Sequence, residues 1–263
     1  MHIHIGCAGW SYKDWENSFY PKKISQSDHL SYYAKYFDLN EVNSTFYHVP
    51  SQTTVEGWFK KVPEDFLFII KVWRKITHEI SKEGLDSRVA EFFYRLRPLK
   101  PKIKAFLLQF PPRFDFSNKY INQLRYLIEL LPGEYEYFIE LRDNSWYNED
   151  ILSEIAQKQI FIVTSYLKDL IPYYQEQKKL YIRLIGDRTL STFNRIQREK
   201  KEEIIAILKK INKIKEQRRI REIFIIVNNH FTGFAPETAN LIKKRLGIPI
   251  KKFKKQKTLL DFS

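Results

Sequence analysis

Short apolar segments alternate with more polar segments along the whole chain. Eight apolar segments are rich in Ile, Val, Phe and Tyr, a composition that predicts buried strands. They run from His2 to Cys7, Leu39 to Thr45, Phe66 to Val72, Lys104 to Phe110, Tyr135 to Leu141, Ile160 to Ser165, Leu180 to Ile185 and Ile223 to Asn228. Apolar residues at helical spacing predict helices between them, from His29 to Phe37, Val89 to Leu96, Ile121 to Leu131, Ile151 to Ile155, Glu202 to Ile214 and Pro236 to Leu246.

The order of these elements predicts the fold class. Eight strands alternating with helices over about 250 residues are typical of a (β/α)₈ TIM barrel. A doubly wound sheet is the alternative, but it usually carries a G-x-G-x-x-G turn after its first strand. Here that turn reads Gly6-Cys7-Ala8-Gly9. We therefore expect an α/β protein with one (β/α)₈ TIM barrel over residues 1–248 and a short basic tail over residues 249–263.

One face of several predicted strands becomes polar toward its C-terminal end. This face carries Leu39, Glu41 and Asn43 in the second strand, and Phe138, Glu140 and Arg142 in the fifth. The series Ile69-Lys71-Trp73 and the pair Tyr181-Arg183 follow the same pattern. Active sites of TIM barrels lie at the C-terminal ends of the strands. The pattern therefore predicts a functional mouth, although each single instance is also compatible with a solvated strand end.

Composition and charge indicate which partners and which cellular location to expect. The 263 residues include 45 Lys+Arg against 31 Asp+Glu, a formal net charge of +14, which favours polyanionic partners such as DNA or RNA. The single cysteine, Cys7, excludes an intramolecular disulfide framework. The first residues lack the pattern of a signal peptide, and no segment approaches the roughly 18 apolar residues needed to span a bilayer. We expect a cytoplasmic protein that does not bind a membrane.

The strand ends also carry a family pattern. In one order, the chain contains Gly9-Trp10-Ser11-Tyr12, Glu41-Val42-Asn43-Ser44-Thr45-Phe46-Tyr47, Thr77-His78, Gln109-Phe110-Pro111-Pro112, Glu140-Leu141-Arg142 with Ser145-Trp146, Tyr181-Ile182-Arg183, Asn228-Asn229 and Gly233-Phe234-Ala235-Pro236. This series resembles the DUF72, or YecE-like, family over nearly the full length. The resemblance implies a TIM barrel and leaves the biochemical role open. Ile185 and Asp143 stand where histidine is common in the family.

The predicted mouth combines two carboxylates with an excess of cations. The candidate catalytic residues are Glu41, Lys71, His78, Glu140, Arg142 and Arg183. The candidate substrate-binding residues are the aromatic and amide side chains Trp10, Tyr12, Asn43, Tyr47, Gln109, Trp146, Asn228 and Asn229. Three cations against two carboxylates favour an anionic ligand, and phosphate fits best. The alternatives are that Glu140 and Arg142 only tie strand ends together, and that about half of the aromatics belong to the core.

The chain carries no strong metal motif. His78-Glu79 is followed by Lys82 instead of the second histidine of H-E-x-x-H. A divalent cation, Mg²⁺ or Mn²⁺, held by Glu41, Glu140 and water is still compatible with the sequence, because such sites need few protein ligands.

The basic tail ends in a short motif. Gln256, Leu259 and Phe262 have the spacing of a PIP box, the peptide that binds the sliding clamp PCNA through a short helical turn. Ser263 stands where a second aromatic residue is usual. The alternative is that these apolar residues pack back on the barrel.

These features support three functions. The first is a nucleic-acid phosphodiester hydrolase, in which the cations neutralise the phosphate and Glu41 or Glu140 activates water, with or without a metal ion. The second is an enzyme that acts on a sugar or sugar phosphate, because paired carboxylates and aromatic platforms also suit glycoside chemistry. The third is a non-catalytic accessory factor for nucleic acid that uses its tail to join a larger assembly.

Overall fold

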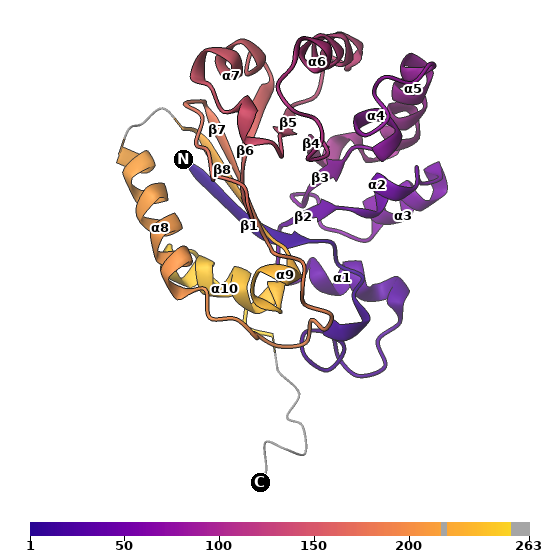
Figure 1. Cartoon of the computed structure of the whole chain (residues 1–263). Helices are drawn as coiled ribbons and strands as arrows, with labels where there is room; N and C mark the ends of the chain where they lie inside the picture. The colour runs from indigo at the N-terminus through magenta and orange to yellow at the C-terminus, as the bar shows by residue number, and fades with distance from the viewer. Residues whose placement is uncertain (217–219, 254–263) are drawn as a thin grey trace.

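Eight parallel strands close into a barrel in the computed structural model, which describes residues 1–216 and 220–253 (Figure 1). Each strand pairs with the next in the chain, and β8 closes the barrel by pairing with β1 along six residues. The strands are β1 His2–Ala8, β2 Leu39–Val42, β3 Leu67–Lys71, β4 Ile103–Gln109, β5 Tyr137–Glu140, β6 Ile160–Leu167, β7 Lys179–Gly186 and β8 Glu222–Val227.

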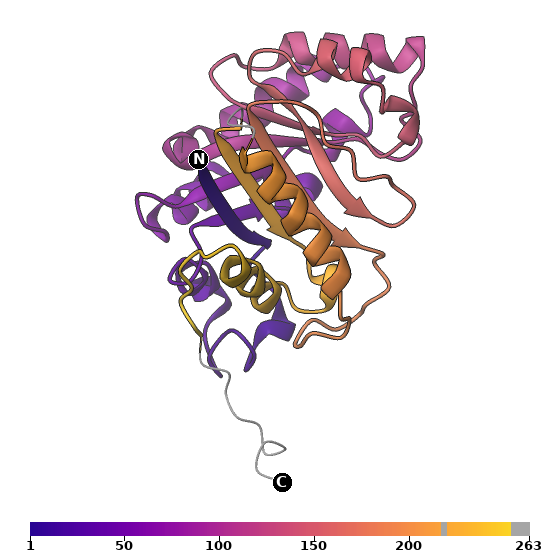
Figure 2. The ribbon, with the colours of Figure 1, turned by 90° about the vertical axis from the view of Figure 1, so that its left-hand side faces the viewer.

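The helices surround the barrel on its outside. Figure 2 shows α8 and α10 lying over the strands that come first and last in the chain. The α-helices are α1 His29–Tyr33, α2 Ser44–Tyr47, α3 Gln52–Lys60, α4 Arg74–Thr77, α5 Leu85–Leu96, α6 Asn118–Leu130, α7 Glu149–Ile155, α8 Lys201–Glu216, α9 Asn229–Thr232 and α10 Ala235–Arg245. Short 3₁₀ helices occupy Lys13–Trp15, Gln26–Asp28, Arg97–Lys102 and Asn144–Trp146.

The structure confirms the (β/α)₈ barrel and all eight predicted strands, with differences at the edges. β2 ends at Val42 instead of Thr45, because Asn43 takes helical backbone angles and precedes the short helix α2. Helix α3 was not among the predicted helices. Residues 168–178, which join β6 to β7, contain no helix, so the alternation of strand and helix is broken once. Pairing between neighbouring strands does not require a helix in every connection.

The apolar core has two parts. The inner part fills the barrel with Leu39, Ile69, Leu107, Phe138 and residues from the other strands. The outer, larger part lies between the strands and the helices and includes Trp15, Phe106 and Trp146. Inner and outer residues alternate along each strand, as the pleat of a strand requires. The inner part ends in polar residues only at the ends of the strands.

Close packing between β1 and β2 fixes one side of the mouth. A Cβ atom on Gly6 would lie 2.0 Å from the carbonyl oxygen of Leu39, so only glycine fits there. The hydroxyl of Tyr33 donates to the same oxygen at 2.8 Å and accepts from the backbone N–H of Cys7. Two residues after Leu39, the same strand presents Glu41 to the barrel interior.

The described part of the chain continues past α10 to Phe253. The ring of Phe253 packs on Phe19 with centroids 5.0 Å apart, so this stretch stays on the barrel. The predicted clamp-binding residues Gln256, Leu259 and Phe262 lie outside the described residues. Within residues 1–216 and 220–253, no helix is long and apolar enough to cross a membrane.

Candidate functional site

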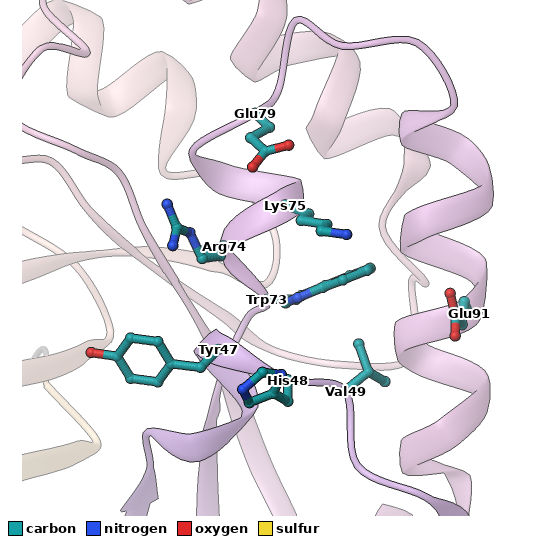
Figure 3. A pocket seen from close by; sticks show the side chains of 8 residues that line it. All are labelled: Tyr47, His48, Val49, Trp73, Arg74, Lys75, Glu79 and Glu91. Atoms are coloured by element: carbon teal, nitrogen blue, oxygen red, sulfur yellow. The ribbon is translucent and has the colours of Figure 1, made fainter.

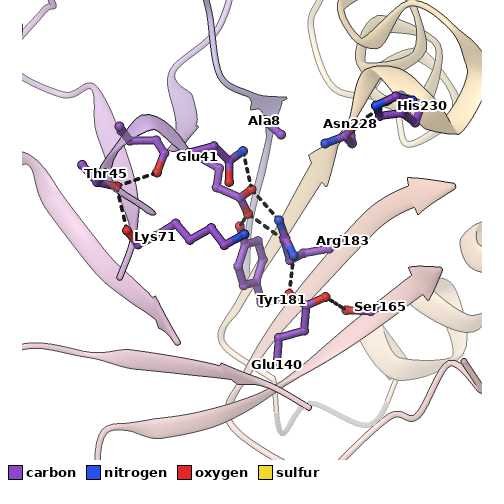
Figure 4. A network of polar contacts seen from close by, with 12 residues as sticks. Ala8, Glu41, Thr45, Lys71, Glu140, Ser165, Tyr181, Arg183, Asn228 and His230 are labelled. Carbon is purple, nitrogen blue, oxygen red and sulfur yellow. Dashed lines mark hydrogen bonds and ion pairs between the residues drawn. The ribbon is translucent and has the colours of Figure 1, made fainter. Parts of the chain in front are cut away.

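Polar side chains from five strands meet at the C-terminal mouth of the barrel (Figure 4). We call the set Glu41, Lys71, Glu140, Arg142, Ser165, Tyr181 and Arg183 the mouth network. Its members come from β2, β3, β5, β6 and β7, with Arg142 following β5. The parity read from the sequence is confirmed, because these side chains share the inner face with the apolar residues that fill the barrel.

Arg183 is the centre of this network. Its Nη2 and Nε donate to the two carboxylate oxygens of Glu41 at 2.7 Å and 2.8 Å. Its Nη1 donates to Oε2 of Glu140. Both carboxylates are fully buried and Arg183 is 3% exposed, so one guanidinium bridges two acids in a region that water hardly reaches. Bidentate pairing of this kind fixes geometry as well as charge.

Further donors occupy the remaining carboxylate oxygens. Tyr181 donates its hydroxyl to Glu41, and Asn43 donates to it at 3.0 Å. Ser165 donates to Glu140 at 2.9 Å, and Nε of Arg142 donates to the same oxygen at 3.2 Å. Each oxygen of the two buried acids therefore accepts at least one hydrogen bond.

These contacts set the charge of Glu140. Burial by itself would raise the pKa of its carboxyl group, but the charges of Arg142, Arg183 and Lys71 lower it to about 2. The two acids in turn raise the pKa of Arg183, although burial opposes the change. Glu140 is thus a carboxylate at neutral pH and has no proton to give as a general acid.

Lys71 differs from its neighbours because its ammonium group has no acceptor. Among residues 1–216 and 220–253, no carboxylate lies within ion-pair distance of its Nζ and no hydrogen bond is made by it. The nitrogen lies 3.9 Å from the centroid of the Phe46 ring. The backbone is held firmly, since Thr45 donates to the carbonyl oxygen of Lys71 at 2.6 Å. The residue is 7% exposed, so its amine has narrow access to solvent.

Burial and like charges favour the neutral amine. Burial lowers the pKa of Lys71, and Arg183 and Arg142 lower it further, while the two glutamates raise it, so that it falls to about 7. His78 lies nearby, edge-on to Phe46 with ring centroids 5.0 Å apart. Burial and the charge of Lys71 lower the pKa of His78 to about 4. At neutral pH the site therefore holds a neutral imidazole beside a lysine that readily changes its charge.

Arg142 also has an unused donor. Its side chain is 5% exposed, and its Nη2 is buried without a hydrogen-bond partner among the described residues. Burial lowers the pKa of Arg142, and the nearby charges of Arg183 and Arg188 act in the same direction. An excess of cationic donors over acceptors is the electrostatic signature of an anion site.

The predicted amide residues take different places. Asn228 caps α9 by accepting from the N–H of His230 at 3.1 Å, and its side-chain nitrogen points toward the mouth in Figure 4. Asn229 is buried and accepts from Trp15 at 3.1 Å, which ties α9 to the β1 loop. Gln109 is buried and donates to the carbonyl oxygen of Phe110 at 2.5 Å. Only Asn43 contacts the mouth network directly.

The predicted aromatic residues are divided between core and surface. Trp146 is fully buried and donates to the carbonyl oxygen of Phe114 at 2.7 Å, which places it in the core instead of at a ligand. Trp10 packs edge-on against Trp58 at 5.6 Å, and Tyr12 donates to the carbonyl oxygen of Ala8 at 2.6 Å. Tyr47 is 60% exposed and is the member of the set with the most surface for a ligand.

A cavity lies on the α2–α4 side of the mouth (Figure 3). It has a volume of about 540 Å³ and is lined by Tyr47, His48, Val49, Trp73, Arg74, Lys75, Glu79 and Glu91. Trp73, two residues after Lys71 in the chain, is one of these residues, and Nζ of Lys75 lies 4.9 Å from the Trp73 ring centroid. The cavity therefore combines aromatic surface with two cations and two carboxylates, and no member of the mouth network lines it.

The donor set of the network does not fit a divalent cation. Oxygens of Glu41 and Glu140 that would bind Mg²⁺ or Mn²⁺ already accept from Arg183, and three cations surround them. Within the described ranges no group of three or more His, Cys, Asp or Glu side chains is placed to hold a metal ion. The mouth network as it stands is therefore a set of paired charges and not a metal site.

Two members of the network were not among the predicted site residues. Tyr181 shares the inner face of β7 with Arg183, and Ser165 ends the inner face of β6 after Phe161 and Val163. Strand parity placed Tyr181 on the polar face beside Arg183, although it was not selected as a site residue, and it could have identified Ser165. Their hydroxyl groups are not distinctive in a sequence, because serine and tyrosine occur at many solvated strand ends. Ile185, at the position where histidine is common, is 2% exposed.

Fold and site together define a class: a (β/α)₈ barrel with a buried, cation-rich cluster at its C-terminal mouth. The chain belongs to the DUF72 family, whose sequence profile, described as "Protein of unknown function DUF72", matches residues 4–260.

Relatives with known sequences and structures agree with this assignment. The UPF0759 protein YunF of Bacillus subtilis is 24% identical over 274 residues, covering 94% of this chain and 95% of YunF. The UPF0759 protein YecE of Escherichia coli K12 is 30% identical over 145 residues, covering 55% of this chain and 50% of YecE. The crystal structure of a DUF72 family protein (TM1631) from Thermotoga maritima superposes with a TM-score of 0.79 at 26% identity, covering 94% of this chain and 100% of that one.

Proposed function

We propose that the barrel mouth is the active site of an enzyme that acts on a small anionic substrate, best matched by a sugar phosphate. One observation carries the proposal: Nη2 of Arg142 is buried without a hydrogen-bond partner, and Nζ of Lys71, in a residue that is 7% exposed, also has no acceptor among the described residues. A buried donor without a partner is costly, so a ligand that supplies acceptors recovers that free energy on binding.

The two donors suit different parts of such a substrate. A guanidinium matches the geometry of a phosphate group, and Arg142 has a free Nη2 with the charge of Arg188 nearby. Lys71 has the lowered pKa of a group that transfers protons or attacks an electrophile near neutral pH. We assign Arg142 to the anionic group of the substrate and Lys71 to the reacting carbon.

The same contacts give less support to the predicted phosphodiester hydrolase. That mechanism needs a carboxylate that is free to hold a metal ion or to deprotonate water. Glu41 and Glu140 are both fully buried and both bind Arg183, and Glu140 has a pKa of about 2, which makes it a weak base. The net charge of +14 keeps DNA and RNA as partners to be tested.

Binding to purified protein tests the proposal. We expect inorganic phosphate and dihydroxyacetone phosphate to raise the melting temperature of the wild type, since a ligand of the folded state stabilises it. Arg142→Met should weaken this binding about tenfold, the effect of losing one charged hydrogen bond worth about 1.4 kcal/mol. Lys179→Met, which changes a cation at the other end of the barrel, is the matched control and should bind as the wild type does.

Two results would contradict the proposal. One is the absence of any stabilisation by phosphate or the sugar phosphate. The other is cleavage of a labelled oligonucleotide by the wild type in Mg²⁺ or Mn²⁺, if Arg142→Met abolishes this cleavage. That result would favour the predicted nuclease over the sugar-phosphate enzyme.

A further inference from the structure

The described chain buries three lysines at nearly the same depth, and their surroundings differ. Lys71, Lys102 and Lys243 are 7%, 6% and 7% exposed. Lys102 donates to three carbonyl oxygens, those of Phe59, Val62 and Pro63, at 3.0, 2.7 and 2.9 Å.

Lys243 lies 3.6 Å from a carboxylate oxygen of Asp38. Lys71 alone of these three has neither a hydrogen bond nor an ion pair from its Nζ within the part of the chain that the structure describes. Two of these ammonium groups have polar partners in the described chain, whereas the third has only the face of the Phe46 ring.

The place of Lys71 in the barrel gives it access to a ligand. It is the last residue of β3, on the inner face at the mouth, where TIM barrels place reacting groups. Phe46 covers one side of the amine at 3.9 Å and contacts His78 with its ring edge at 5.0 Å. A buried amine beside other cations is the environment that turns lysine into a nucleophile.

We infer that Lys71 forms an imine with the carbonyl group of a phosphorylated ketone while Arg142 binds the phosphate. This inference rests on the proposed function and adds the chemical step. It makes the enzyme one that works through a covalent Schiff base, in which the protonated imine withdraws electrons from the adjacent carbon so that a bond on that carbon forms or breaks.

The step balances without a further reactant. The ammonium of Lys71 gives one proton to the neutral imidazole of His78, and the amine nitrogen attacks the carbonyl carbon while the π electrons move to oxygen. The oxygen takes the proton back from His78 and a second one from the nitrogen, and leaves as water. An ammonium and a ketone thus become a protonated imine and one water molecule. His78 is neutral at pH 7 because its pKa is lowered to about 4, so it holds the proton only transiently and readily returns it to the departing oxygen.

Reductive trapping tests this step. The wild type is incubated with dihydroxyacetone phosphate at neutral pH, reduced with sodium borohydride, digested and mapped by mass spectrometry. We expect the reduced adduct on the peptide with Lys71 at a yield at least tenfold above that on the peptides with Lys102 and Lys243, which are internal controls of equal burial. Acetone in place of dihydroxyacetone phosphate should lower the yield of the adduct at Lys71 at least tenfold.

A variant separates covalent chemistry from binding. Lys71→Arg keeps a cation but cannot form an imine, so it should lose the adduct and still bind inorganic phosphate. An unmodified Lys71 in a wild type that binds phosphate would overturn the imine and leave the anion site standing. An adduct no higher at Lys71 than at Lys102 would overturn it too. If phosphate also fails to bind the wild type, the proposed function falls together with the imine.

Discussion

Each end of the barrel holds a network of ion pairs, and the two networks differ in charge balance and burial. At the N-terminal end, Lys104 and Lys179 bind Glu222 at 2.8 Å and 2.5 Å, and Lys179 also binds Glu136 at 2.5 Å. Two cations face two carboxylates there, and their side chains are between 15% and 26% exposed. At the mouth, three cations face two carboxylates that water does not reach.

This difference separates a structural role from a functional one. In the N-terminal network each charge has an opposite partner and some water, and the one buried atom of these four residues without a hydrogen bond is an acceptor, Oε2 of Glu136, which does not suit an anion. In the mouth network Arg183 satisfies both acids, while Lys71 and one nitrogen of Arg142 remain without acceptors in the described chain. Buried donors without partners cost stability, and proteins keep that cost mainly where function needs the group.

The largest expected difference between the two ends is the loss of unfolding free energy when the central cation of the mouth network, Arg183, is removed. Arg183→Met removes the cation that both buried carboxylates share, which leaves Glu140 with Arg142 and Glu41 with no ion pair among the described residues, and should lower the free energy of unfolding by about 3–5 kcal/mol. Urea denaturation followed by circular dichroism measures it. A loss below about 1 kcal/mol would mean that water reaches Glu41 and Glu140 and that the mouth resembles the other end.

The pH dependence of stability isolates Lys71. The unfolded chain keeps the ordinary lysine pKa of 10.5, whereas in the folded protein it falls to about 7 because of burial and then Arg183. Between these values the unfolded state binds more protons, so Lys71 makes stability rise with pH, by up to about 1.4 kcal/mol per pH unit. Below pH 7 the full destabilising effect of this lysine is present.

Comparison with Lys71→Met measures this effect. The free energy of unfolding of the wild type minus that of the variant should increase from pH 7 to pH 9 in urea titrations, because the other titrating groups are common to both proteins. A difference that stays constant over this range would show that Lys71 titrates as an ordinary exposed lysine.

Ligand binding gives the next smaller effect. The tenfold weaker phosphate binding expected for Arg142→Met corresponds to about 1.4 kcal/mol, and isothermal titration calorimetry at fixed salt resolves it. The Lys179→Met protein should retain the affinity of the wild type. Equal losses in both variants would mean that phosphate follows the overall positive charge and not the mouth.

The smallest effect is expected at the N-terminal end. Lys104→Met leaves Glu222 with its second partner Lys179, and partly exposed ion pairs are worth about 0–1 kcal/mol. The loss should shrink further in 1 M salt, which screens charges that water reaches. A salt-independent loss of more than about 2 kcal/mol would show that this network is as tightly coupled as the mouth.

The sequence by itself determined the barrel and the inner face of its strands. Residues two apart in a strand point to the same side, so the alternation of side chains alone places Glu41, Lys71, Glu140 and Arg183 at one end of the barrel. The same rule places Tyr181 on this face and would have found Ser165. Local periodicity also located the six predicted helices, because an amphipathic pattern is carried by neighbours in the chain.

Only the tertiary structure decided how these side chains are paired. Glu41 and Arg183 are 142 positions apart, and no local pattern shows that one guanidinium binds two acids while Lys71 has no acceptor among the residues that the structure describes. The sequence also did not show which side chains are buried: Trp146 lies in the core and Tyr47 on the surface, although both are aromatic residues near strand ends. Pairing and burial depend on closure of the barrel, which brings β2, β5 and β7 to one mouth. Whether a charged side chain there is paired or available to a ligand therefore depends on which residues closure places beside it.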